Sequence, residues 1–380
     1  MKKLAAKIYE SVINPPSDEK LSKAREESGM SLPTLWLLGK TGAGKSTIIQ
    51  KLTGESAARI GNGFMPCTQG SAYFDYPKEH AILRFLDTRG LGEAGYDASE
   101  DIESLGKSSH AILVVMRVRD GEQSVVIEAI RQIRKSARHI RSSDIMVVHT
   151  GAEEVAEEHD RTRAVELKQQ AVEQAWKAPL DHCQVDFGEV GPDGALNDVG
   201  ADELSTLIGT KMPELKIWLQ RSQRKSAEKS NFDRLSTEVL WYSSTAAASD
   251  AVPLVGLVSV PAIQGKMLHS LAQKYDIEWN TRSFSEFTAA LGTGFAIRYA
   301  ASLGGRQLTR LIPVYGQVVG TALSVVISYA STYALGRAAC SYLYHKKTNT
   351  PLDEDSLRSI YSDAVAEGRE AGKSMFGKDK

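Results

Sequence analysis

Cysteine is scarce in this chain of 380 residues, which has three, Cys67, Cys183 and Cys340, far apart in the sequence. No two of them have the spacing of metal ligands, and an odd number argues against a disulfide framework. We therefore expect a reducing compartment, either the cytoplasm or the cytoplasmic face of a membrane. The simplest interpretation of each cysteine is a small buried apolar residue.

An excess of charge of either sign is also absent, because the formal net charge is -1. Hydrophobic residues make up 42% and charged residues 24% of the chain, which is the balance of a folded globular protein. No basic surface that would hold a nucleic acid is indicated, so we infer no specific nucleic acid as a partner. The 8 histidines form no spaced cluster, and no metal site built from histidine is expected.

A continuous apolar core is missing from the first residues. Lys2 and Lys3 are followed by apolar residues at helical spacing, which argues against a signal peptide and favours an amphipathic helix. The sequence Asn14-Pro15-Pro16 is expected to end that helix. Such a helix packs on its own protein more often than it lies on a membrane, and both interpretations stay open. We expect residues 1–31 to form this helix and a linker.

Short β-rich apolar runs alternate with helical patterns from about residue 32 to about residue 220. This alternation predicts an α/β fold, a mostly parallel sheet with helices on both faces. A turn at Pro77-Lys78-Glu79 predicts one antiparallel hairpin. The predicted strands are residues 35–38, 72–76, 82–86, 112–116, 145–148 and 183–187, and the predicted helices are residues 124–138, 162–177 and 203–219.

Strand patterns disappear after residue 220. We expect a linker at residues 221–234, an all-α domain at residues 235–345, and a polar C-terminal tail at residues 346–380 that is helical after Pro351. Residues 311–336 carry no charge, so a helix there would be long enough to cross a hydrocarbon core of about 30 Å. Its hydroxyl residues and glycines suit tight packing in a soluble bundle equally well. Peripheral association with a membrane, a true span and a soluble bundle therefore all remain open.

A glycine-rich loop connects the first predicted strand to an apolar helix start. It fits the pattern GxxxxGK[ST] in the strand–loop–helix context that this pattern requires. Its backbone amides and the helix start are suited to phosphates, Lys45 is expected to reach the β- and γ-phosphates, and the Ser46 hydroxyl to bind Mg²⁺. We therefore predict a site for a purine nucleoside triphosphate with Mg²⁺, most of all GTP. The nucleotide-binding residues are Gly39, Lys40, Thr41, Gly42, Ala43, Gly44, Lys45, Ser46 and Thr47.

Two further segments complete the predicted phosphate site. The strand at residues 82–86 runs into Asp87-Thr88-Arg89-Gly90, a DxxG pattern. Asp87 is expected to hold Mg²⁺ through water, and the Gly90 N–H to sense the γ-phosphate. Between the two motifs, Thr68 lies in a glycine-rich loop of the kind that orders around a γ-phosphate. Thr68 is the best candidate for a hydroxyl that closes on Mg²⁺.

The segments GKTGAGKST and DTRGLGE, together with Thr68, resemble the TRAFAC-class GTPases, and within them the Era-like, septin-like and immunity-associated relatives. The resemblance covers about residues 32–220 and implies a G domain that binds GTP and GDP with Mg²⁺. Leu91 stands where small GTPases have a water-positioning glutamine, so Lys45, Thr68 and Arg89 are the catalytic candidates. Arg89 replaces a usual proline, and is either a surface residue or an arginine finger, in cis or across a G-domain homodimer.

The base-recognition box is less regular. The family reads guanine with NKxD or TKxD, whereas this chain offers Thr150-Gly151-Ala152-Glu153 after the strand at residues 145–148. We expect Thr150 and Glu153 to bind the nucleotide, the Glu153 carboxylate accepting two hydrogen bonds from guanine. Gly151 replaces the lysine whose stem normally covers the base. GTP is therefore the expected nucleotide, and a P-loop ATPase remains an alternative.

The second half also has a resemblance. Residues 262–267, 312–320 and 332–337 are similar to the helical domain of unknown function of YcjF-type bacterial membrane proteins, over about residues 235–345. This implies a bacterial protein in which a nucleotide switch with slow hydrolysis is coupled to a helical, membrane-prone module. Its expected place is the cytoplasm, or a peripheral or integral position at the inner membrane. A membrane-associated scaffold that binds nucleotide with little turnover is the other alternative.

Overall fold

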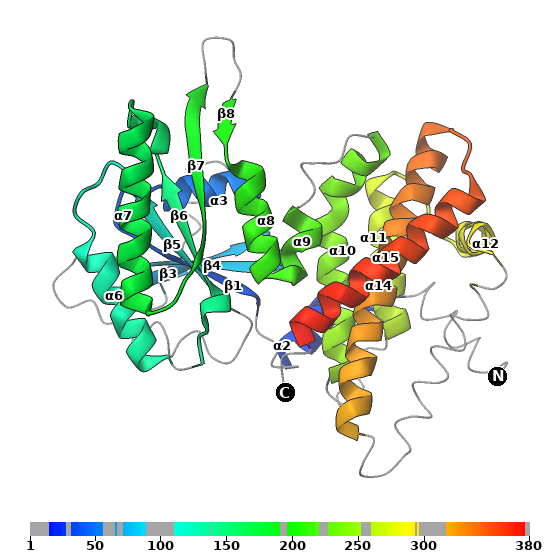
Figure 1. Cartoon of the computed structure of the whole chain (residues 1–380). Helices are drawn as coiled ribbons and strands as arrows, with labels where there is room; N and C mark the ends of the chain where they lie inside the picture. The colour runs from blue at the N-terminus through cyan, green and yellow to red at the C-terminus, as the bar shows by residue number, and fades with distance from the viewer. Residues whose placement is uncertain are drawn as a thin grey trace. The chain divides into compact units, whose positions relative to one another are not determined.

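The computed structural model describes residues 15–27, 32–55, 65–66, 71–88, 110–137, 139–190, 196–219, 227–251, 260–292, 295 and 317–376. The chain forms two compact units, Ser31–Gln220 and the combination of Met1–Met30 with Arg221–Lys380. The first is an α/β unit, and the described residues of the second are all-α (Figure 1). The fold class predicted from the sequence, an α/β P-loop NTPase followed by an all-α region, is confirmed.

The α/β unit is organised around a sheet with the strand order β2-β3-β4-β1-β5-β6-β7-β8. From β4 through β1, β5 and β6 to β7 the neighbouring strands are parallel. The strands β2, β3 and β8 pair in antiparallel fashion. The bounds are β1 Thr34–Leu38, β2 Met65–Pro66, β3 Ser71–Tyr76, β4 Leu83–Thr88, β5 His110–Arg117, β6 Ile145–Thr150, β7 Asp181–Val190 and β8 Leu196–Val199.

All six predicted β-rich runs are found in strands, and β3 and β4 form the predicted hairpin. Every residue of β1 and β6 is buried, as expected for central parallel strands that are covered on both faces. The edge strands β2 and β8 were not predicted. The two residues of β2 are too few for a pattern, and the sequence Leu196-Asn197-Asp198-Val199 of β8 has polar residues at its centre.

Helices cover both faces of the sheet. In Figure 1, α6 and α7 lie on the opposite side of the sheet from α8. The core under α6 and α7 joins Trp36 and Ile112 of the sheet to Ile130 and Trp176 of the helices. The predicted helix at residues 203–219 is divided into two, because Pro213 has no N–H to continue the first and instead begins the second. The bounds are α3 Lys45–Thr53, α6 Ser124–Ser136, α7 Glu158–Trp176, α8 Ala201–Lys211 and α9 Pro213–Leu219.

The helical unit is built around α14, which contacts α10, α11 and α15. Glycines bring these helices close together. A Cβ on Gly336 of α14 would lie 2.6 Å from Val239 Cγ1 of α10, and a Cβ on Gly368 of α15 would lie 2.8 Å from Ala330 Cα of α14. The bounds are α2 Asp18–Glu27, α10 Ala227–Ala251, α11 Val260–Lys274, α12 Thr281–Ala290, α14 Gln317–Thr348 and α15 Glu354–Phe376.

The described helices bear on two of the expected segments. The predicted linker at residues 221–234 overlaps α10, which begins at Ala227 and already buries Phe232. The polar tail at residues 346–380 contains α15, which agrees with the helix expected there, and Gly368 of α15 packs against α14. Both segments are rich in charge, and their apolar residues at helical spacing decide the structure. The amphipathic helix predicted before Pro15 lies outside the described residues.

Polar contacts are buried along α14. Ser328 donates a hydrogen bond to the Asp250 carboxylate, and Gln264 donates one of 3.0 Å to the Thr332 hydroxyl. Arg337 forms two hydrogen bonds with Glu228, of 2.5 and 3.0 Å. The described part of the chain contains no helix with the length and hydropathy of a bilayer span. Residues 317–336 of the uncharged stretch lie in α14, and residues 311–316 lie outside the description.

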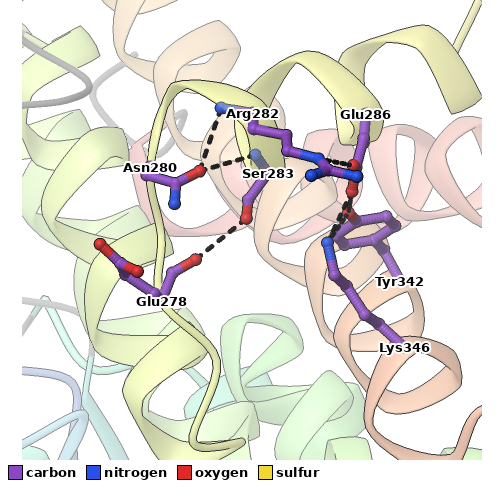
Figure 2. A network of polar contacts seen from close by, with 7 residues as sticks. All are labelled: Glu278, Asn280, Arg282, Ser283, Glu286, Tyr342 and Lys346. Atoms are coloured by element: carbon purple, nitrogen blue, oxygen red, sulfur yellow. Dashed lines mark hydrogen bonds and ion pairs between the residues drawn. The ribbon is translucent and has the colours of Figure 1, made fainter.

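A polar network fixes α12 to α14 (Figure 2). Asn280 caps α12 by accepting hydrogen bonds from the backbone N–H groups of Arg282 and Ser283, at 3.0 and 3.1 Å. One turn later, the Glu286 carboxylate accepts from Lys346 Nζ at 2.6 Å and from the Tyr342 hydroxyl at 3.1 Å, both on α14. Lys346, Arg282 and Tyr342 lower the pKa of Glu286 to about 2.

Candidate nucleotide-binding site

The glycine-rich loop lies between the end of β1 at Leu38 and the start of α3 at Lys45. A Cβ on Gly39 would lie 2.5 Å from the Val115 carbonyl oxygen of β5, so only glycine fits there. Gly42 and Gly44 have positive φ angles of 80° and 98°, which an L side chain rarely adopts. The loop therefore needs its glycines, and α3 directs its N-terminal amides toward the space that the loop encloses.

Lys45 and Asp87 meet at this loop. Asp87 is the penultimate residue of β4, the parallel neighbour of β1, and stands opposite Leu37 in the strand register. Lys45 Nζ lies 3.5 Å from Asp87 Oδ1 and donates hydrogen bonds to the carbonyl oxygens of Gly39 at 2.6 Å and of Lys40 at 3.0 Å. Burial lowers the pKa of Lys45, and the Asp87 charge opposes that shift. A bound phosphate with Mg²⁺ needs an ammonium group for the phosphate oxygens and a carboxylate for the ion. Lys45 and Asp87 provide these two groups side by side.

The donor set fits Mg²⁺. Ser46 is exposed in the first turn of α3, and Asp87 offers a carboxylate at the end of the neighbouring strand. Hydroxyl and carboxylate oxygens are the hard ligands that Mg²⁺ prefers, and it usually completes its shell with water and phosphate. Within the described residues, no three His, Cys, Asp or Glu side chains are grouped as a metal cage. These residues would therefore hold the ion only together with a nucleotide.

The prediction that each cysteine is a small buried residue can be checked at two positions. Cys183 and Cys340 are both free and buried. Burial raises the pKa of the Cys183 thiol to about 12, so it stays protonated and unreactive. Cys67 lies outside the described residues, as do Thr68, Arg89, Gly90 and Leu91.

The end of β6 supports the loop from the other side. The Thr150 hydroxyl donates a hydrogen bond of 2.7 Å to the Ala43 carbonyl oxygen, and Thr150 is buried. Gly151 follows with a φ of 63°, in the left-handed region. Thr150 therefore contacts the glycine-rich loop, the P-loop of this fold, through its side-chain hydroxyl.

Glu153 lies at the expected end of β6, with a side chain that is 53% exposed. Its carboxylate accepts a hydrogen bond of 2.6 Å from Arg161 of α7. Its backbone N–H donates to Asp186 Oδ2 of β7 at 2.9 Å. An incoming base edge would therefore compete with Arg161 for the Glu153 carboxylate.

Two ion pairs at the site were not expected from the sequence. Lys40 Nζ lies 3.0 Å from Asp120 Oδ2 and donates to the Glu122 carbonyl oxygen at 2.9 Å. Arg117, the last residue of β5, forms two hydrogen bonds with Glu154. The available signal was a charged cluster directly after the apolar strand at residues 112–116, where parallel strands present functional residues.

Residues 34–151 match the family model described as 50S ribosome-binding GTPase. A curated relative, magnetosome membrane protein 22 of Magnetospirillum gryphiswaldense, is 28% identical over 128 residues, which is 33% of this chain and 65% of the relative. The match therefore spans less than two thirds of that relative's length.

Among solved structures, a bacterial selenocysteine-specific elongation factor shares 20% identity at a TM-score of 0.34, covering 48% of this chain and 29% of that one. Toc33 from Arabidopsis thaliana, a dimerization-deficient mutant, shares 19% at a TM-score of 0.33, covering 47% and 85%. Likeness this weak supports no conclusion about activity. The P-loop geometry and the family model together support a GTP-binding G domain in the α/β unit.

Proposed function

We propose that this chain is a magnesium-dependent GTPase with slow intrinsic turnover, and that it acts as a nucleotide-controlled switch. The observation that carries the proposal is the juxtaposition of Lys45 and Asp87 at the glycine-rich loop, with 3.5 Å between Nζ and Oδ1. A triphosphate entering the loop would offer Lys45 a partner in place of the loop carbonyls. It would also offer Asp87 a magnesium ion to bind.

Each residue of the site has a positioning or electrostatic task in this proposal. The loop amides and Lys45 bind the β- and γ-phosphates, and Ser46 and Asp87 hold the ion, Asp87 through water. When bound, Mg²⁺ neutralises charge on the phosphate oxygens. Thr68 would close on the ion, the Gly90 N–H would sense the γ-phosphate, and Arg89 would serve as an arginine finger.

Slow turnover follows from the residue after Gly90. Leu91 has no polar group with which to orient an attacking water, so the site needs help from elsewhere. A second copy of the G domain is the proposed source of that help. Activity per molecule should then rise with protein concentration, because the assisted species is a dimer.

Guanine is the proposed base. The Glu153 carboxylate lies at the end of β6 and would exchange its hydrogen bond with Arg161 for two with the base edge. The backbone around it is held by the bond from the Glu153 N–H to Asp186. This arrangement gives Glu153 a fixed backbone and a side chain that is free to change partner.

A peripheral association of the chain with membranes is proposed from the name of the curated relative, which is called a membrane protein. In this proposal, the nucleotide bound to the G domain would control the association of the helical unit with the membrane. Flotation with liposomes of bacterial lipid composition tests this part, in the presence of GDP and of a non-hydrolysable GTP analogue. A chain that stays at the bottom of the gradient with both nucleotides would exclude it.

Nucleotide binding and turnover on the purified chain test the central proposal. We expect magnesium-dependent GTP binding, and a GTPase rate per molecule that rises between nanomolar and micromolar protein. Binding of GTP without turnover at any concentration would instead favour a nucleotide-binding scaffold. Equal binding of ATP and GTP would refute the choice of guanine.

A further inference from the structure

Arg117 stands where the sheet, the P-loop and the loop after β6 come together. It is the last residue of β5, opposite Thr150 in the parallel register of β5 and β6. Its guanidinium donates to both carboxylate oxygens of Glu154, at 2.6 Å to Oε1 and 3.2 Å to Oε2. It also donates to the Gly42 carbonyl oxygen of the P-loop, at 3.4 Å. The two carboxylate bonds fix the plane of the guanidinium as well as its position.

The Arg117–Glu154 pair accounts for Gly151. A Cβ at position 151 would lie 2.9 Å from Glu154 Oε1, the oxygen that receives the shorter bond from Arg117. The positive φ of Gly151 disfavours a larger residue independently. The pair thus occupies the space that a side chain from position 151 would take. A lysine at this position would require the Glu154 carboxylate to shift and would adopt a backbone conformation that L side chains rarely take.

The other charges of the region have separate partners. Lys45 is at the Asp87 side of the loop, where the phosphates are expected, and Arg161 is bound to Glu153. Arg117 is 44% exposed at its side chain, and it contacts Gly42 in the middle of the P-loop. In open parallel sheets the ligand lies outside the carboxyl ends of the strands, which is where β5 and β6 present Arg117 and Thr150. A nucleotide with its phosphates in the loop would extend its base past these two strand ends.

We propose that Arg117 covers one face of the nucleotide base, with Glu154 holding the guanidinium in the orientation for stacking. A planar guanidinium stacks well on aromatic rings, and a purine offers the largest such face among the nucleobases. The contact is made to the face of the ring, so it strengthens guanine and adenine nucleotides alike. The choice between the two is left to Glu153, at the edge. This inference rests on the proposed nucleotide site.

The test compares ligands with and without a base. Affinities for GTP, ATP and inorganic tripolyphosphate are measured on the full chain with Mg²⁺, by competition with a fluorescent GTP. For Arg117→Ala we expect GTP and ATP affinities to fall together, by about tenfold, the scale of a partly desolvated cation–π contact. The affinity for tripolyphosphate should change less than twofold. Arg119→Ala is the matched control, because Arg119 is an exposed arginine two residues after Arg117, in the turn that follows β5.

Two further variants separate stacking from charge and from folding. Arg117→Lys keeps the cation without the plane, and should lose several-fold in GTP affinity even if Arg117→Ala folds poorly. Glu154→Gln weakens the hold on the guanidinium and should give a smaller loss of the same kind. Unchanged GTP affinity in Arg117→Ala or Arg117→Lys would overturn the proposal. An equal loss for GTP and tripolyphosphate would overturn it too, since it would place Arg117 at the phosphates.

The same experiment distinguishes this inference from the proposed function. If the unmodified chain binds no GTP, the nucleotide site itself is wrong. If the unmodified chain binds GTP and Lys45→Ala does not, the site is correct. An Arg117→Ala variant that then binds GTP normally contradicts the base-covering role alone.

Discussion

The Thr150 hydroxyl and the Ala43 carbonyl oxygen are joined by a buried hydrogen bond of 2.7 Å. It links the strand end that carries the proposed base-reading residues to the loop that carries the phosphate-binding residues. We therefore expect a displacement of the end of β6 to move the glycine-rich loop as well.

Thr150→Val keeps the shape of the side chain and removes its donor. The Ala43 carbonyl would then be buried without this partner, and we expect a loss of about 1–2 kcal/mol in the free energy of unfolding, together with weaker GTP binding. Urea unfolding and GTP titration measure the two effects. Thr206→Val, at an exposed helical threonine, should change stability by less than about 0.5 kcal/mol. Equal behaviour of the two variants would argue against the link.

Lys45→Ala should abolish GTP binding and leave the fold intact. Lys45 is buried with a lowered pKa, so removing it relieves a desolvation cost while deleting the main cation of the phosphate site. Thermal shift with GTP and Mg²⁺ provides the measurement. Lys51→Ala is the control, since Lys51 lies on the same helix and pairs with Asp198 instead. A retained thermal shift in Lys45→Ala contradicts the proposed site.

Glu153→Ala should remove a preference for GTP over ATP while affecting ATP binding little. A bidentate carboxylate contact of about 2–3 kcal/mol corresponds to tens- to a hundredfold in affinity. Competition of both nucleotides against a labelled GTP gives the ratio. Glu166→Ala, at an exposed position of α7, should leave the ratio unchanged. A ratio that survives in Glu153→Ala would assign base choice to other residues.

The sequence was most informative about the phosphate half of the site and least about the base half. The loop from Gly39 to Ser46 combines a local pattern with its flanking strand and helix, so the signal that predicts it is local in the sequence. Arg117 and Glu154 are far apart in sequence, and their pairing depends on the register of β5 and β6. Charged residues carry no periodic signal that would predict such a contact.

The helical unit was harder to predict for a related reason. Its polar segment at residues 227–234 is helical and buries Phe232, and composition alone does not reveal the helices on which it packs. The uncharged stretch at residues 311–336 was equally ambiguous. Small residues such as Gly336 suit a bilayer and a tight bundle alike, and the contact of Gly336 with Val239 is made to a helix distant in sequence.

Acid should destabilise the α/β unit below about pH 6.5. His149 is buried and its pKa is lowered from 6.5 to about 4, first by burial and then by His182 and Lys168, against the hydrogen bond with Gln169. Because the unfolded chain takes up a proton near pH 6.5 and the folded chain only near pH 4, stability is complete above 6.5. It decreases as the pH falls toward 4, by at most about 1.4 kcal/mol per pH unit.

Urea unfolding at several pH values measures that slope. His149→Gln should reduce it, whereas His139→Gln, at an exposed histidine, should leave it intact. An unchanged slope in His149→Gln would show that other groups account for the acid sensitivity.

The ion pair between Arg337 and Glu228 should be costly to break from one side. Both side chains are largely buried, at 9% and 16% exposure. Arg337→Met leaves the Glu228 carboxylate without this partner, and we expect a loss of about 3–5 kcal/mol in stability. Adding Glu228→Leu to the same chain should recover most of it. Thermal unfolding compares the single and double variants, and a double variant as unstable as the single one would contradict this account.

The three polar contacts along α14 fix the rotation of this helix about its own axis. Ser328, Thr332 and Arg337 each meet a partner on α10 or α11. A rotation of α14 by one residue, about 100°, would turn all three away from those partners at once. Intermediate angles would bury the same groups against apolar neighbours, which costs free energy without a compensating bond. Any conformational change in this unit should therefore carry α10, α11 and α14 as one rigid group.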